Sequence, residues 1–102
     1  DIVNIKVMKL GLLVALEGAR LARACGFGLM IGGLVESRLG MASAAHLACG
    51  LGGFAYADLD TPLFFATDPM RGVPIGRGGV YDLSKVRAGI GVVPLDSRAQ
   101  SC

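Results

Sequence analysis

The chain has 102 residues, with ten Lys and Arg against eight Asp and Glu, and 53% of its residues are hydrophobic. This length corresponds to about one small domain, and the hydrophobic content excludes a disordered chain. The net charge of +2 provides no basic surface for nucleic acid, so we expect no nucleic-acid partner. Charged residues make up 18% of the sequence, which is few for a small domain with a large relative surface. The composition therefore suggests a piece of a larger protein.

The cysteines and the first residues indicate the cellular setting. Cys25, Cys49 and Cys102 are an odd number and widely spaced, which argues against a disulfide framework or a zinc site and favours the cytoplasm. The chain begins at Asp1 with strand-like residues and no signal peptide, as expected of a start within a longer protein. Residues 39–57 lack formal charge, but they are rich in Ala and are interrupted by glycines. We therefore expect no membrane association.

Residues 2–8 alternate in the manner of a β-strand. Because successive side chains of a strand point to opposite faces, the alternation divides these residues into two sets. One face carries Val3, Ile5 and Val7, and the other carries Asn4, Lys6 and Met8.

The next predicted elements are a helix over 12–25, a strand over 27–34, a helix over 39–49 and a strand over 54–59. The second strand is apolar throughout, so we expect it to be buried on both faces. The first helix has polar Glu17, Arg20 and Arg23 opposite an apolar face. That apolar face is predicted to contain Val14, Gly18, Leu21, Ala22 and Cys25.

The alternation of strands and helices predicts an α/β fold with a parallel sheet. Three parallel strands with two helices do not close on themselves, because both outer strands keep unpaired backbone groups. The chain is therefore a slice of either an open α/β sheet or a barrel. We expect residues 1–62 to form this unit and residues 63–102 to form an irregular tail, with a hairpin turn at 76–79.

Candidate functional side chains follow the ends of the predicted strands, where parallel α/β folds place their active sites. Lys6 lies on the face opposite the apolar stripe of the first strand, and Glu36 follows the second strand. Asp58 and Asp60 follow the third strand, and their two-residue spacing places both carboxylates on one face. Isolated buried charges are costly, so these side chains favour a functional site over simple packing.

Each of these residues also has a structural interpretation. Lys6 can be a salt-bridged lysine at a strand end, and Glu36 can accept backbone N–H groups at the start of the following helix. Asp58 and Asp60 can belong to a turn before Pro62. The residues alone leave these alternatives open.

Four segments carry a resemblance to a known family. They are Asn4-Ile5-Lys6-Val7-Met8-Lys9-x-Gly11, Glu36-Ser37-x-Leu39-Gly40, Ala44-Ala45-His46-x-Ala48 and Asp58-x-Asp60-x-Pro62. In this order and spacing they are similar to the C-terminal third of the mandelate racemase and muconate-lactonising enzyme group of the enolase superfamily. The nearest branch is the dipeptide epimerases of the L-Ala-D/L-Glu type. The resemblance is strong over residues 1–70 and weak beyond them.

The resemblance implies a modified (β/α)7β barrel, in which the three strands are the sixth, seventh and eighth. The tail then returns to an N-terminal capping domain. The implied activity is that of an isomerase: a proton next to a carboxylate is removed, an enediolate is held on Mg²⁺, and the proton is returned. The implied substrate is a dipeptide, and whether the complete enzyme is a homo-oligomer stays open.

The resemblance also assigns roles to individual residues. Lys6 corresponds to one of the two acid/base lysines, and Asp58 and Asp60 correspond to the carboxylates that contact the substrate α-ammonium. The segment ending at Glu36 lines the site beside the substrate carboxylate. The acidic ligands of Mg²⁺ and the second base have no counterpart in this sequence, so we expect them upstream and the chain alone to be inactive.

The sequence departs from the family pattern in two places, and alternatives follow. Gly11-Leu12 replaces a Gly-Gly pair, and Gly33-Leu34-Val35 replaces Cys-Met-x before the Glu-Ser pair, which puts the exact substrate in doubt. Alternatives within the superfamily are o-succinylbenzoate synthase, muconate cycloisomerase and N-acylamino-acid racemase. The pair Asp58-x-Asp60 argues against all three, because their substrates have no ammonium group to bind. A non-catalytic fragment with a structural role is the remaining alternative.

Overall fold

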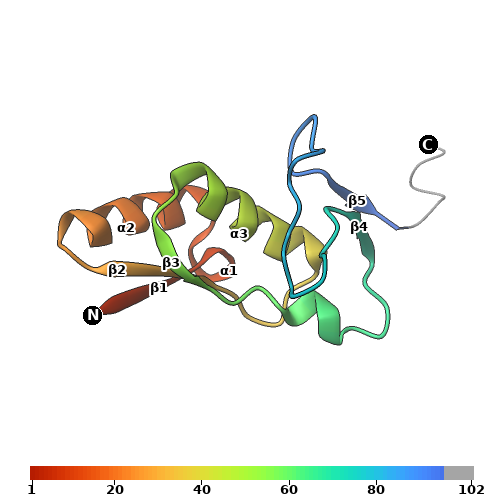
Figure 1. Cartoon of the computed structure of the whole chain (residues 1–102), viewed down its shortest axis with the longest axis horizontal. Helices are drawn as coiled ribbons and strands as arrows, with labels where there is room; N and C mark the ends of the chain where they lie inside the picture. Colours follow the sequence, from red (N-terminus) through yellow and green to blue (C-terminus); the bar gives the residue numbers. More distant parts are fainter. Residues whose placement is uncertain (96–102) are drawn as a thin grey trace.

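The structure, a computed structural model, describes residues 1–95. Three strands, β1 (Ile2–Lys6), β2 (Gly28–Gly32) and β3 (Phe54–Ala57), form a parallel sheet in the order β1-β2-β3. Two long helices, α2 (Leu12–Ala24) and α3 (Arg38–Leu51), connect the strands and lie on the same side of the sheet (Figure 1). This arrangement confirms the predicted α/β class.

The core lies between the sheet and the two helices. Ile5, Leu29 and Ile31 point from the strands into this layer and are almost completely buried. The helices contribute mainly alanines, namely Ala15, Ala19 and Ala22 from α2 and Ala44 and Ala45 from α3, together with the larger Met41 and Leu47. Alanines allow the helices to approach the sheet closely, and burial of each large aliphatic side chain contributes about 1.5–3 kcal/mol.

The predicted apolar face of the first helix is correct at Ala22 and wrong at its larger residues. Val14 and Leu21 are 54% and 67% exposed, whereas Ala15 and Ala19 are completely buried. The helical period is correct, but the predicted set lacks Ala15 and Ala19, which form the centre of the buried face. The close contact between helix and sheet instead selects alanines. Val14 and Leu21 consequently face away from the sheet, whereas Leu16 packs against the core.

The first strand is shorter than predicted. β1 ends at Lys6, and Val7–Leu10 form a single helical turn, α1, which ends at Gly11 with φ +74°. Val7 and Met8 therefore do not continue the alternation of the strand. A short apolar alternation does not distinguish a strand from a helical turn, and here the Gly11 N–H closes the turn by donating to the Val7 carbonyl at 2.7 Å.

The second strand is buried on one face only, which corrects the expectation of burial on both. Leu29 and Ile31 are buried beneath the helices, but Met30, on the opposite face, is half-buried. Gly32, on that same face, lies beneath the Asn4 side chain, but no helix of residues 1–95 covers the face. This asymmetry leaves one face of the sheet open.

The tail after residue 62 is held by short pieces of regular structure. A 3₁₀ helix, η1 (Thr61–Phe64), precedes an antiparallel pair of strands, β4 (Met70–Gly72) and β5 (Val92–Pro94). Ile75 and Tyr81 form an antiparallel bridge, which confirms the predicted hairpin turn at 76–79. The tail lies at the end of the molecule toward which the strands run, beside the start of α3 (Figure 1).

Two further predictions concern Cys102 and membrane association. Cys102 lies outside the described residues. Within residues 1–95, none of the helices is both long and apolar enough to cross a membrane.

Candidate active site

The open face of the sheet carries the polar side chains of the strands. Its residues are Asn4 and Lys6 from β1, Met30 and Gly32 from β2, and Tyr56 from β3, as their pairing in register shows. Tyr56 is 57% exposed, and Asn4 is also exposed. The helices cover the other face, so this one is available to a ligand.

Lys6, Gly32 and Asp58 lie in one row across this face. Lys6 pairs with Gly32, and Ile31 pairs with Ala57. The Asp58 N–H donates to the Ile31 carbonyl at 2.9 Å. The parallel pairing of β2 and β3 therefore continues for one residue beyond β3, and Asp58 lies beside Gly32. Paired residues of parallel strands point to the same face, and two strand spacings separate the Lys6 and Asp58 Cα atoms by about 10 Å.

At the centre of this row, Gly32 has no side chain of its own and leaves room for the side chain of Asn4. A Cβ atom at Gly32 would lie 2.6 Å from Oδ1 of Asn4, so the amide of Asn4 already occupies the space above it. A larger residue at this position would displace Asn4. The surface between Lys6 and Asp58 is therefore low and polar.

Asp58 and Asp60 are brought together by the residue between them. The Leu59 side chain is buried in the core, and both carboxylates are exposed. Both aspartates line one cavity of about 150 Å³, whose opposite wall includes Ile75 and the glycines of the hairpin turn. The alternation thus persists past β3, although Asp60 already belongs to the turn that precedes η1.

Lys6 lines a different cavity, together with Asn4, Lys9 and Leu10. The structure therefore places Lys6 on the same face as Asp58 but does not bring it into the cavity of the two aspartates. Over residues 1–95, the ion pair within 4 Å is Arg38–Asp68, and Lys6 has no carboxylate partner at that distance. The salt-bridged interpretation of Lys6 is not realised in this part of the chain.

Glu36 is buried, and its contacts contradict the interpretation that it accepts N–H groups at the start of the following helix. The carboxylate accepts the backbone N–H of Leu34 at 2.8 Å, two residues before it, and not a group of the following helix. The first N–H of α3, from Arg38, instead donates to the Asp68 carboxylate of the tail at 3.0 Å. The capping interpretation of Glu36 is therefore wrong, because a residue thirty positions away in sequence supplies the acceptor.

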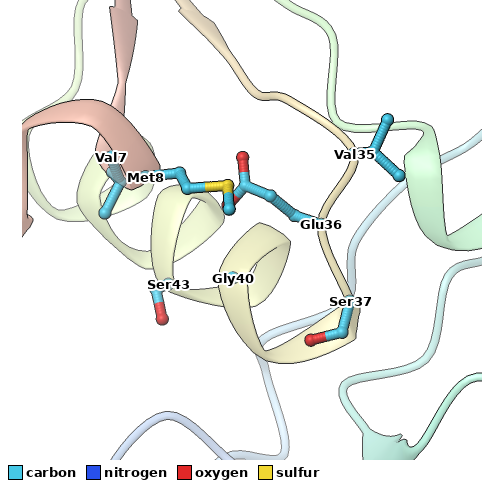
Figure 2. Close-up of a pocket in the computed structure, with 7 residues that line it drawn as sticks. All are labelled: Val7, Met8, Val35, Glu36, Ser37, Gly40 and Ser43. Atoms are coloured by element: carbon cyan, nitrogen blue, oxygen red, sulfur yellow. The ribbon is translucent and has the colours of Figure 1, made fainter.

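The Glu36 carboxylate borders a mostly apolar pocket of about 310 Å³ at the carboxyl end of the sheet. The pocket lies between α1 and the start of α3, and Figure 2 shows the Glu36 side chain directed toward Met8. Its lining residues are Val7, Met8, Val35, Glu36, Ser37, Gly40 and Ser43. The Glu36 carboxylate therefore fixes the loop between β2 and α3 from inside the protein.

Two glycines in helices give a matched test of this packing. A Cβ atom at Gly40 would lie 2.5 Å from Oε1 and 3.2 Å from Cβ of Glu36, whereas one at Gly18 meets nothing within 4 Å. We expect Gly18→Ala to raise the free energy of unfolding by about 0.5–1 kcal/mol, since alanine is the better helix former. Gly40→Ala should lower it by about 1–3 kcal/mol through overpacking. Urea unfolding of both variants measures this, and equal stabilisation would contradict the described packing of Glu36.

Tyr81 belongs to the site region but was not predicted. Its hydroxyl donates to the Leu59 carbonyl at 2.5 Å, between the two aspartates. Burial raises the pKa of Tyr81 to about 12, with the Arg38 guanidinium opposing the rise and Asp60 adding to it. The phenol therefore stays protonated and remains a donor. Twenty-two residues separate Tyr81 from Leu59, so no local pattern could indicate this contact.

The described residues do not fit a metal centre. Within residues 1–95, no group of three or more His, Cys, Asp or Glu side chains could hold a metal ion. Asp58 and Asp60 point into their cavity as a pair without a third ligand. Their chemistry suits a cationic organic group, because two exposed carboxylates accept hydrogen bonds from an ammonium.

Three βα-linked parallel strands, with polar residues at their carboxyl ends and one face uncovered, are an arrangement found in part of a (β/α) barrel. The family model of the enolase C-terminal domain-like proteins matches residues 1–98. The chain belongs to this family, as the sequence resemblance predicted.

Known proteins similar to the chain are named as epimerases. An aromatic dipeptide epimerase from Herpetosiphon aurantiacus is 50% identical over 92 residues, which cover 90% of this chain and 26% of the relative. The chain thus spans about a quarter of the length of the curated relatives that it matches. The smaller span accounts for the incomplete sheet, because the other strands of a barrel have no counterpart here.

Solved structures show the same likeness. A mandelate racemase/muconate lactonizing enzyme from Roseiflexus sp. matches with a TM-score of 0.87 and 51% identity, over 92% of this chain and 27% of that one. The dipeptide epimerase from Cytophaga hutchinsonii, complexed with Mg and the dipeptide D-Ala-L-Val, matches with a TM-score of 0.83 and 35% identity. This match covers 96% of this chain and 27% of that one.

Proposed function

We propose that the chain is the C-terminal part of a dipeptide epimerase, which inverts one α-carbon by removing and returning a proton. Lys6 is the acid/base on one side of that carbon, and Asp58 and Asp60 bind the α-ammonium of the substrate. The observation that carries this proposal is the row formed by Lys6, Gly32 and Asp58 on the open face of the sheet. The Lys6 and Asp58 Cα atoms lie about 10 Å apart across this polar face, and an extended dipeptide spans about 7 Å.

The proposed chemistry divides between the two ends of this row. At one end, the paired carboxylates neutralise and orient the ammonium, which fixes the position of the rest of the substrate. At the other end, the Lys6 amine takes the α-proton when uncharged and returns it when charged. The Asn4 amide, which fills the space above Gly32, gives the substrate backbone a polar surface between the two groups.

Glu36 acts indirectly in this proposal. The resemblance implies a position for Glu36 beside the substrate carboxylate, but Glu36 is only 7% exposed and its own carboxylate accepts the Leu34 N–H. We propose that Glu36 contributes to substrate binding by holding the backbone of the loop after β2. Backbone groups of that loop then face the substrate carboxylate.

The cofactor belongs to the complete enzyme and not to this segment. The residues described here do not form a metal site, and the Cytophaga hutchinsonii neighbour is complexed with Mg. We propose that Mg²⁺, its ligands and the second base come from the part of the barrel that precedes this chain. The metal would stabilise negative charge on the substrate carboxylate. The isolated chain should then be inactive.

The proposed setting is the reducing cytoplasm. Cys25 and Cys49 are exposed and free, and neither forms a disulfide within the described residues. Two exposed thiols favour a reducing compartment, where such groups persist. The proposed partner is a small dipeptide.

A chimera tests the proposed function. In this chimera, the matching quarter of the Herpetosiphon aurantiacus relative is replaced by residues 1–102. We expect the chimera to epimerise dipeptides, followed as incorporation of deuterium at the α-carbon in D₂O. The relative truncated before the replaced segment is the control and should be inactive. A folded chimera that does not exchange the α-proton of any dipeptide would contradict the proposal.

A further inference from the structure

We propose that Tyr81 is a positioning residue for the ammonium-binding carboxylates, through which the tail holds Asp58 and Asp60 in place. This inference rests on the proposed function. Tyr81 does not touch the substrate in this proposal. It acts through the backbone of Leu59.

Leu59 is the central residue of the segment that carries both aspartates, residues 58–60, which is called the aspartate segment below. The Leu59 side chain is buried in the core, so its backbone lies between two side chains that point the other way. Its carbonyl accepts the Tyr81 hydroxyl at 2.5 Å. Rotation of the peptide after Leu59 would move Asp60 out of the cavity, and this hydrogen bond opposes that rotation.

Among residues 1–95, the other hydrogen bonds hold the start of the segment, at Asp58, and its end, at Asp60 and Thr61, where the Asp60 carbonyl accepts the Leu63 N–H. At the start, the Asp58 N–H donates to the Ile31 carbonyl at 2.9 Å. At the end, the Thr61 hydroxyl donates to the Leu34 carbonyl at 2.7 Å. Tyr81 supplies the restraint between these two points.

The same residue also joins the two walls of the cavity. Tyr81 pairs with Ile75 across the hairpin, and Ile75 lines the cavity opposite the aspartates together with Gly78 and Gly79. One wall therefore consists of the aspartate segment and the other of the hairpin. The hydrogen bond from Tyr81 to Leu59 sets the distance between them.

The protonation state of Tyr81 suits this role. Its pKa of about 12, raised by burial, keeps the hydroxyl a donor throughout the neutral range. Because the folded-state pKa lies above the ordinary value of 10.0, the hydrogen bond is fully present below pH 10 and is lost as the pH rises toward 12. The positioning is therefore independent of pH near neutrality.

The experiment is the Tyr81→Phe variant of the chimera, which removes one hydroxyl and keeps the ring. Loss of one hydrogen bond worth about 0.5–1.5 kcal/mol should raise KM for a dipeptide about two- to twelvefold, with kcat changed less than twofold. An N-acetylated dipeptide has no ammonium, so its KM should be the same for the chimera and for its Tyr81→Phe variant. Ser84→Ala is the matched control, because it removes a tail hydroxyl that bonds Asp82 far from the aspartate segment in the chain.

Backbone amide hydrogen exchange gives a second readout that does not need activity. In Tyr81→Phe, the Leu63 amide, which donates to the Asp60 carbonyl, should exchange at least threefold faster, while amides within β2 stay unchanged. An inactive chimera would overturn the proposed function and leave this measurement to decide the inference. Unchanged exchange, or an unchanged KM in an active chimera, would overturn the role of Tyr81. An equal rise in KM for the N-acetylated dipeptide would show general destabilisation and would also overturn it.

Discussion

The Lys6→Ala variant of the chimera should lose α-proton exchange from one of the two epimers of a dipeptide. General acid–base catalysis by a positioned side chain contributes about 100- to 10,000-fold, so kcat for epimerisation should fall by that factor. The opposite epimer should still exchange its proton, because the base on the other side of the α-carbon is untouched. Exchange of each epimer in D₂O, followed by mass spectrometry, separates the two half-reactions.

Two further variants make this result specific to proton transfer. Lys6→Arg keeps the positive charge but cannot release a proton in proteins, so it should be as impaired as Lys6→Ala. Lys85→Ala removes an exposed lysine of the tail and should leave exchange unchanged. If Lys6→Arg retains exchange at both faces, Lys6 serves as a fixed charge and not as the acid/base.

The Asp58→Asn and Asp60→Asn variants should each raise KM for dipeptides strongly. A hydrogen bond to a charged group contributes about 1.5–3 kcal/mol, and each 1.4 kcal/mol corresponds to a factor of ten. We therefore expect KM to rise about 10- to 100-fold for each variant. The double variant should show less than the product of the two effects, because both carboxylates serve one ammonium group. Steady-state kinetics with a free and an N-acetylated dipeptide measure the difference.

Asp82→Asn provides the control for these variants. Asp82 is exposed, and its carboxylate accepts hydrogen bonds from Ser84 in the tail, so its loss should not change KM. The N-acetylated dipeptide should be equally poor with all the variants, because it lacks the cationic group. A rise in KM that is identical for both substrates would show that the aspartates act on folding and not on the ammonium.

Local patterns in the sequence predicted much of the fold, because the signals for each element lie within the element. The apolar run 27–34 and the alanine-rich stretch 39–49 became β2 and α3 with shifts of one or two residues. The glycines after each helix marked its end, and the hairpin turn at 76–79 was evident from composition. The buried face of α2 was missed in part because the sequence shows which residues are apolar but not how close the sheet approaches.

The site shows the same division. Lys6 and Asp58 could be placed on one face from the period of two along their strands, and the structure has them in one row. The burial of Glu36 could not be foreseen, because it depends on the space that Gly40 leaves on the neighbouring helix. The acceptor for the first N–H of α3 came from Asp68, whose position depends on the path of the tail.

The sequence by itself determined the α/β class, the order of its elements and the family, because period, glycine positions and short motifs are local properties of the chain. The tertiary structure alone decided which alanines meet the sheet, which cavity each polar side chain lines, and that Tyr81 reaches the Leu59 carbonyl. These contacts join residues that are far apart in sequence. These contacts depend on how closely the elements pack in three dimensions, and a pattern along the sequence does not give the distances between elements.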